Sequence, residues 1–151
     1  EALVRPVEGA EDDIEAAIDG VKALDISTGD VVIALAASGE TAFTIAAVDS
    51  AKRAGALTIG IANNRNTGLL ATAVYPILLE TGAEALAGST SLKAGTAQKI
   101  CLNLLSTQIM VLLGRIKDGL MSEMRPRNAK LRRRHAEITA LLAAGKKAES
   151  D

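Results

Sequence analysis

The sequence predicts an α/β protein in which helices pack on a parallel sheet. Three short aliphatic runs alternate with segments of helical character between residues 31 and 79. Strands that alternate with helices are joined by right-handed crossovers into a parallel sheet. The 151 residues are 48% hydrophobic but only 1% aromatic, so aliphatic side chains must fill the core. Such packing suits helices laid against a parallel sheet.

The first elements follow from turn residues and apolar spacing. A helix is predicted over 10–24, where an acidic first turn complements the helix dipole. An apolar strand follows over 31–36. The next helix, over 41–54, ends before Gly55, a residue type that commonly follows a helix. The second strand covers 57–62.

The remaining elements complete the sheet and add two helices. A short helix over 67–72 precedes a strand over 74–79, in which Pro76 favours an edge position because proline cannot donate to the ladder. A long apolar helix is predicted over 92–114 and a C-terminal amphipathic helix over 127–144. A helix as apolar as the first of these belongs in the core or in a subunit interface.

The chain is expected to divide into a binding domain over residues 1–118 and a helical extension over 119–151. Its net charge of −1 offers no electrostatic case for nucleic acid. The uncharged stretch 100–114 is too short and too polar to span a bilayer, so no membrane partner is expected. The single cysteine, Cys101, excludes a disulfide within the chain and fits a reducing, cytoplasmic compartment.

Charge is distributed unevenly along the chain. Among the first thirty residues the charged ones are mostly acidic, and six basic residues lie between 125 and 134. Two interpretations remain open for the basic run. It is a solvated helix face that meets a subunit contact, or it binds RNA or a membrane surface.

The turn between the first strand and its helix predicts an anion site. Ala36, Ala37, Ser38 and Gly39 form a small-residue turn. Free backbone N–H groups and the dipole at the start of a helix both favour negative charge. Ser38 adds a hydroxyl, as does Thr41 at the helix start, so a phosphate is the expected ligand. The alternative is that these two residues only cap the helix.

Polar residues follow all three predicted strands. Ser38, Asn63 and Glu80 each fall at the carboxyl end of a strand. Ligands of open parallel sheets bind beyond these ends. The sequence therefore places a binding site at this edge of the sheet.

Several motifs resemble a known superfamily. The turn AASGET at 36–41 is similar to the phosphosugar-binding turn of sugar isomerase (SIS) domains. A second block has the spacing of that superfamily too: Glu84 lies five residues before Ser89 and Thr90, and Lys93 follows them. The resemblance implies a SIS-type, flavodoxin-like three-layer αβα sandwich that binds a sugar phosphate.

Longer runs resemble N-acetylmuramic acid 6-phosphate etherases. VEGAED at 7–12 and KAGTAQK at 93–99 occur in the order typical of that family. The resemblance covers roughly residues 1–135 and implies cleavage of the lactyl ether to N-acetylglucosamine 6-phosphate and D-lactate, in cell-wall sugar recycling. It also implies a homodimer and no metal or organic cofactor. In such an elimination a base takes the proton beside the open-chain aldehyde, an acid protonates the departing lactate oxygen, and water then adds.

The same resemblance implies roles for individual residues. Glu11 of VEGAED corresponds to a catalytic carboxylate, although it is also explained as an acidic residue in a first helical turn. Lys93 is suited to pair with phosphate or ring oxygens as a point charge, or else opens a helix at the surface. Glu84 lines the pocket or is a solvated loop residue. The full substrate-binding set that the resemblance implies is Ser38, Gly39, Thr41, Glu84, Ser89, Thr90 and Lys93.

Departures from the family pattern support a second hypothesis. The family has Arg in place of Ser91, and Asn and Asp near Gly119 and Glu123. The resemblance implies that the family's first glycine-rich phosphate turn and its main catalytic Glu lie upstream of VEGAED, outside this chain. The alternative function is a non-catalytic regulator that senses sugar phosphates. An aldose–ketose isomerase is a weaker third hypothesis, because the sequence places no base across the first two sugar carbons.

Overall fold

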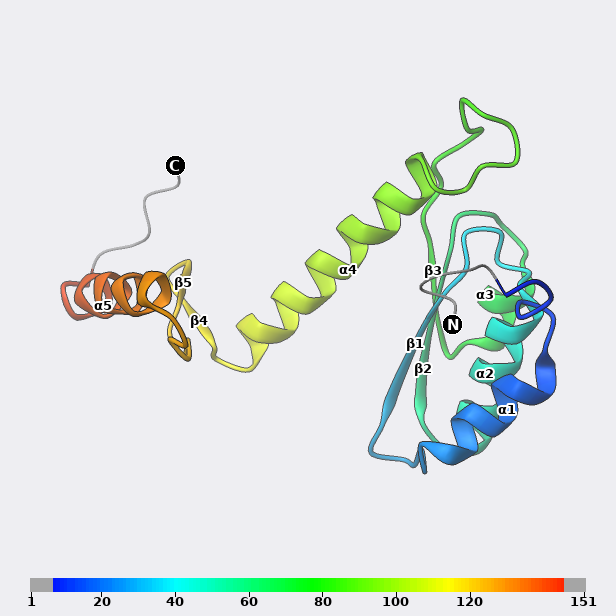
Figure 1. Cartoon of the computed structure of the whole chain (residues 1–151), viewed down its shortest axis with the longest axis horizontal. Helices are drawn as coiled ribbons and strands as arrows, with labels where there is room; N and C mark the ends of the chain where they lie inside the picture. Colours follow the sequence, from blue (N-terminus) through cyan, green and yellow to red (C-terminus); the bar gives the residue numbers. More distant parts are fainter. Residues whose placement is uncertain (1–6, 146–151) are drawn as a thin grey trace. The chain divides into compact units, whose positions relative to one another are not determined.

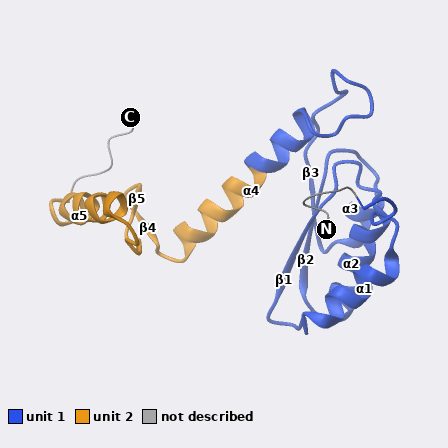
Figure 2. Cartoon of the chain, viewed as in Figure 1, with its two compact units in different colours: residues 1–100 blue, residues 101–151 orange. Residues whose placement is uncertain are grey.

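The computed structural model describes residues 7–145. Residues 1–6 and 146–151, at the outer ends of the two predicted domains, lie outside the described residues. The chain forms two compact units, 1–100 and 101–151 (Figure 2). The division falls within the long helix α4, Lys93–Leu112.

The first unit contains a three-stranded parallel sheet in the order β1-β2-β3 (Figure 1). This confirms the predicted α/β class and the parallel pairing. Pro76 lies in β3 at an edge of the sheet, as expected, opposite Gly60 of β2. The elements of this unit before α4 are α1 (Ile14–Ala23), β1 (Val31–Leu35), α2 (Ala42–Arg53), β2 (Leu57–Ala62), α3 (Gly68–Thr72) and β3 (Tyr75–Leu78).

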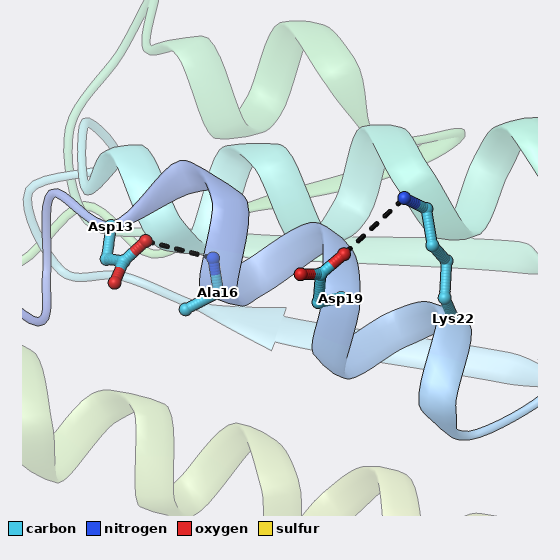
Figure 3. A network of polar contacts seen from close by, with 4 residues as sticks. All are labelled: Asp13, Ala16, Asp19 and Lys22. Atoms are coloured by element: carbon cyan, nitrogen blue, oxygen red, sulfur yellow. Dashed lines mark hydrogen bonds and ion pairs between the residues drawn. The ribbon is translucent and has the colours of Figure 1, made fainter.

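Helix α1 begins four residues later than the sequence predicts. The carboxylate of Asp13 accepts a hydrogen bond from the backbone N–H of Ala16 at 2.9 Å and so caps the helix (Figure 3). The acidic residues before Asp13 therefore lie in turns and not in the helix. One turn further along, Asp19 pairs with Lys22 at 3.4 Å, an exposed pair that adds little to stability.

The core lies between the sheet and the three helices that cover one of its faces (Figure 1). Val48 of α2 and Leu69 of α3 are fully buried against three alanines: Ala34 of β1, Ala36 directly after β1, and Ala73 directly after α3. The small side chains of these alanines let the helices approach the sheet closely. The main core cluster consists of Ala34, Ala36, Val48, Leu69 and Ala73.

The opposite face of the sheet is apolar and exposed. Four of its side chains, Val31, Ile33, Leu57 and Tyr75, are between 38% and 56% exposed. Within the described part of the first unit, helices α1, α2 and α3 cover the other face of the sheet.

Helix α4 closely matches the predicted helix over 92–114. Ala94 is its only buried residue, whereas Ile100, Leu104 and Leu112 are 54%, 67% and 78% exposed. Two locations were expected for such an apolar helix, the core and a subunit interface. Within the described residues, α4 does not lie in the core. A subunit interface stays a prediction. No helix within residues 7–145 is both long and apolar enough to cross a membrane.

The second unit contains a small hairpin that the sequence analysis did not predict. Strands β4 (Ile116–Lys117) and β5 (Leu120–Met121) pair antiparallel. Asp118 and Gly119 between them have φ values of 52° and 78°, as in the tightest two-residue hairpin turns. The predicted domain boundary after residue 118 falls within this turn. Helix α5 (Ala129–Ala143) follows.

Candidate functional site

The turn after β1 can only be built with a glycine. Gly39 is buried and has a φ of 78°. A Cβ atom there would lie 2.4 Å from Oγ1 of Thr67. The Gly39 carbonyl accepts from the N–H of Leu69 at 2.9 Å. These contacts hold the predicted phosphate turn against the start of α3.

The two hydroxyl residues of the turn differ in their bonding. Ser38 is exposed, and its Oγ accepts from the N–H of Glu40 at 3.2 Å. Thr41 is the N-cap residue of α2 but makes no side-chain capping bond. The alternative explanation for Thr41 was that its hydroxyl caps the helix. The hydroxyl makes no such bond in this structure. Glu40 instead accepts from Gly68 N–H at 3.0 Å and ties the turn to α3.

Two asparagines after β2 join the three strand ends. The backbone N–H of Asn63 donates to the Ala37 carbonyl at 3.1 Å, and its side-chain amide donates to the Leu79 carbonyl at 2.9 Å. The Asn64 amide lies 3.2 Å from the Ala37 carbonyl and 3.3 Å from that of Ser38. The carboxyl ends of the strands thus meet where the sequence analysis expected them to.

A cleft of about 180 Å³ opens at this edge. It is smaller than the roughly 300–1,000 Å³ typical of small-molecule sites. Of the predicted site residues, it brings together Glu84, Ser89 and Thr90. Its complete lining is Ala37, Asn63, Asn64, Thr81, Gly82, Ala83, Glu84, Gly88, Ser89, Thr90 and Ala94.

Glu84 closes one wall of the cleft by capping α4. Its two carboxylate oxygens accept from the N–H groups of Ala94, at 2.9 Å, and Lys93, at 3.1 Å. The hydrogen bond from Ala94, helped by that from Lys93, lowers the pKa of the Glu84 carboxyl. This carboxylate thus occupies the anion position at the start of α4, and the bonds close the loop that carries Ser89 and Thr90.

The Glu84 cap predicts a pH dependence of stability. Because its pKa is lowered on folding, the contribution is present above about pH 4.5, the ordinary value, and is lost as the pH falls through the lowered pKa. We expect Glu84→Gln to lower the free energy of unfolding at pH 7, and the difference from the unmodified protein to shrink toward pH 3. Urea denaturation at both pH values measures it. Glu137→Gln, an exposed change on α5, is the control, and a Glu84→Gln difference that does not vary with pH contradicts the assignment.

A second acidic residue at this edge has a different partner. Glu80 forms a two-fold ion pair with Arg65, with both N–O distances at 2.5 Å. Hydrogen bonding to Arg65 lowers the pKa of the Glu80 carboxyl. The pair links the loops that follow β2 and β3, next to the cleft.

The predicted catalytic residue, Glu11, is not among the residues that line the cleft. Its backbone carbonyl accepts from the N–H of Phe43 at 2.9 Å, in the first turn of α2, and the residue is exposed. Segment 7–12 is therefore held at the start of the helix that follows the phosphate turn. Lys93 is also exposed and lines a separate open groove on α4 with Ser91 and Thr96.

The side chains that line the cleft are mostly hydrogen-bonding groups, and few of them are charged. Its lining supplies hydroxyls from Ser89 and Thr90 and an amide from Asn64, and its carboxylate, Glu84, already accepts two hydrogen bonds. Such groups suit the hydroxyls and phosphate oxygens of a sugar phosphate. No cluster of three or more His, Cys, Asp or Glu side chains able to hold a metal ion occurs in residues 7–145.

The fold and this edge define the class of the protein. The SIS domain family matches residues 10–108, and the chain belongs to that family. Among solved structures, the Vibrio vulnificus NanR protein complexed with ManNAc-6P matches with a TM-score of 0.55, at 13% sequence identity, over 90% of this chain and 45% of that one. At that identity the likeness concerns the fold alone.

Closer relatives are N-acetylmuramic acid 6-phosphate etherases. The protein from Deinococcus radiodurans is 52% identical over 130 residues, which is 86% of this chain and 43% of the relative. The protein from Streptomyces coelicolor is 47% identical over 93% of this chain and 45% of its own length. The chain thus spans less than half the length of these curated relatives.

Proposed function

We propose that the chain is part of a carbon–oxygen lyase that cleaves the D-lactyl ether of N-acetylmuramic acid 6-phosphate. The observation that carries this proposal is the 52% identity to an etherase over most of this chain. The products are N-acetylglucosamine 6-phosphate and D-lactate. We place this reaction in the cytoplasm, in the recycling of cell-wall amino sugars.

In this proposal the phosphate lies at the turn that carries Ser38, Gly39 and Thr41. The Thr41 hydroxyl is left available because it does not cap α2. Ser38, Gly39 and Thr41 do not themselves line the cleft, but Ala37 directly before them does. Ser89 and Thr90, which line the cleft and are held by the Glu84 cap, contact the sugar. Lys93, whose neighbour Ala94 lines the cleft, supplies a positive charge near the bound anion.

Glu11 acts as a proton-transferring carboxylate in the proposed reaction. Its segment is anchored to the first turn of α2 through the Phe43 N–H, close in sequence to the turn that holds the phosphate. The rest of the catalytic site, including a second acid–base group, comes from parts of the protein beyond this chain or from a partner subunit. The small volume of the cleft, about 180 Å³, supports this division.

A homodimer is the proposed assembly. Helix α4 exposes apolar side chains along its length, among them Ile100, Leu104 and Leu112. Apolar surface of this kind favours burial against another protein surface. Sedimentation of the full-length protein distinguishes a dimer from a monomer.

One observation favours a second function, a regulator that binds sugar phosphates without turnover. The acidic side chain that lines the cleft, Glu84, is committed to capping α4, so it offers no free base there. Ser91 stands where the etherase family has arginine, and this difference also favours the regulator. A regulator binds the ligand and is stabilised by it, but releases no lactate.

Incubation of the full-length protein with N-acetylmuramic acid 6-phosphate decides between the two. The lyase releases D-lactate, measured with a D-lactate dehydrogenase assay, in proportion to enzyme concentration. A rise in melting temperature on adding the sugar phosphate with no lactate at high enzyme concentration overturns the lyase and supports the regulator.

A further inference from the structure

The side chain of Asn63 bonds two other segments at the carboxyl edge of the sheet. The residue is only 8% exposed. Besides its bond to the Leu79 carbonyl, it accepts from Nε2 of Gln98 at 3.0 Å. One buried amide thus joins the end of β2 to the segment after β3 and to the second turn of α4.

The partners fix the orientation of this amide. A backbone carbonyl only accepts, so the nitrogen of Asn63 must face Leu79. Its oxygen then faces the side-chain amide of Gln98, which donates. Both polar ends are satisfied, and rotating the amide would place oxygen against oxygen and nitrogen against nitrogen.

The bonded segments carry the two walls of the cleft. On one side, the backbone N–H of Asn63 holds the Ala37 carbonyl, directly before Ser38. On the other, Gln98 lies on α4, whose first residues bond Glu84 and close the loop with Ser89 and Thr90. The spacing between the phosphate turn and these hydroxyls therefore depends on Asn63.

We propose that Asn63 is the positioning residue of the cleft. Its backbone N–H holds the turn before Ser38, its buried side-chain amide holds α4 through Gln98, and together these bonds set the distance between the turn and the loop at Ser89 and Thr90. The inference rests on the proposed function, in which both walls contact one sugar phosphate. Asn63 does not touch the reacting atoms. It acts through the groups that it holds in place.

Thr58 offers a matched control. It is fully buried in β2, the strand that Asn63 follows, and its Oγ1 accepts from the Val74 N–H at 3.1 Å. Like Asn63, it links β2 to the β3 region, but it lies toward the other end of the strand. Thr58→Val removes a comparable buried bond without touching the cleft.

The test measures ligand affinity and stability together in the full-length protein. N-acetylglucosamine 6-phosphate is titrated by calorimetry, and melting temperatures are recorded for each variant. Asn63→Ala leaves the Leu79 carbonyl and the Gln98 amide unpaired, and we expect it to weaken binding roughly 10–100-fold. Thr58→Val is expected to lower the melting temperature similarly and to change affinity less than about two-fold. Equal losses of affinity in the two variants overturn the inference.

A double-mutant cycle adds a second readout. Gln98→Ala is expected to weaken binding by itself, and its effect is expected to be much smaller when Asn63 is already alanine, because the two amides act as a unit. Independent effects of the two changes on affinity contradict the proposed link between β2 and α4.

Hydrogen exchange of the ligand-free protein separates this inference from the proposed function. We expect Asn63→Ala, but not Thr58→Val, to speed exchange of the Lys93 and Ala94 N–H groups that bond Glu84. Unchanged exchange at these groups overturns the positioning role whatever the ligand result. Absence of binding by the unmodified protein overturns the proposed function instead.

Discussion

Glu11→Gln is expected to lower the rate of D-lactate release by about 10²–10³-fold, because the amide can neither take up nor return a proton in the elimination. Binding of the sugar phosphate is expected to change little. The Glu11 backbone, which accepts from the Phe43 N–H, is unaltered by the substitution, so the segment keeps its place at the start of α2. Initial rates at saturating substrate measure the effect.

Glu8→Gln is the matched control for this prediction. Glu8 is another exposed carboxylate of the same VEGAED segment, three residues earlier. Its substitution is expected to leave the rate within about two-fold of the unmodified enzyme. A large loss with Glu8→Gln and a small one with Glu11→Gln would reverse the assignment.

Gly39→Ala is expected to lower the free energy of unfolding by roughly 2–4 kcal/mol and to abolish phosphosugar binding. An alanine there would have to adopt a φ of 78°, which is costly for residues with a Cβ atom. It would also place that atom 2.4 Å from Oγ1 of Thr67, and overpacking adds a similar cost. Urea denaturation and calorimetry measure the two effects.

Gly20→Ala provides the control for the glycine substitution. Gly20 lies within α1, and a Cβ atom added there meets nothing within 4 Å. The change is expected to raise the free energy of unfolding by about 0.5–1 kcal/mol. If Gly39→Ala is as well tolerated as Gly20→Ala, the close contact between the turn and Thr67 is not as described.

The sheet and the meeting of its strand ends at one edge were predictable because they depend on order along the chain. Alternating strands and helices require parallel pairing, and parallel strands end at one edge, where Asn63 bonds both Ala37 and Leu79. Pro76 was expected at an edge strand and lies in one. The glycine of the predicted phosphate turn could also be identified from the sequence, because it belongs to a short motif directly after the first strand.

The side-chain network was not predictable in the same way. The position of Asn63 at the edge follows from the sequence, but its partners do not, and no local pattern marks Asn64 or Arg65 as part of the site. Their bonds reach residues 15 to 35 positions away, and such pairings depend on loop conformations that no local pattern fixes. Likewise, Glu84 meets the start of α4 only because the loop between them folds back.

Two other differences have local causes. Asp13 ends the acidic turns and starts α1 by capping it, so the helix is shorter than its acidic composition suggested. The hairpin after α4 did carry a sequence signal, the pair Asp118 and Gly119, both of which adopt positive φ. That dipeptide between apolar residues is a strong hairpin indicator.

The proposed function requires that the carboxyl edge of the sheet binds the phosphate of a sugar phosphate. Calorimetric titration of the full-length protein with N-acetylglucosamine 6-phosphate and with N-acetylglucosamine tests this requirement. We expect the phosphorylated sugar to bind about 100-fold more tightly or better, since several hydrogen bonds to a charged group are involved, and Ser38→Ala to reduce that preference. Equal affinity for the two sugars, or a preference that Ser38→Ala leaves unchanged, would contradict the account.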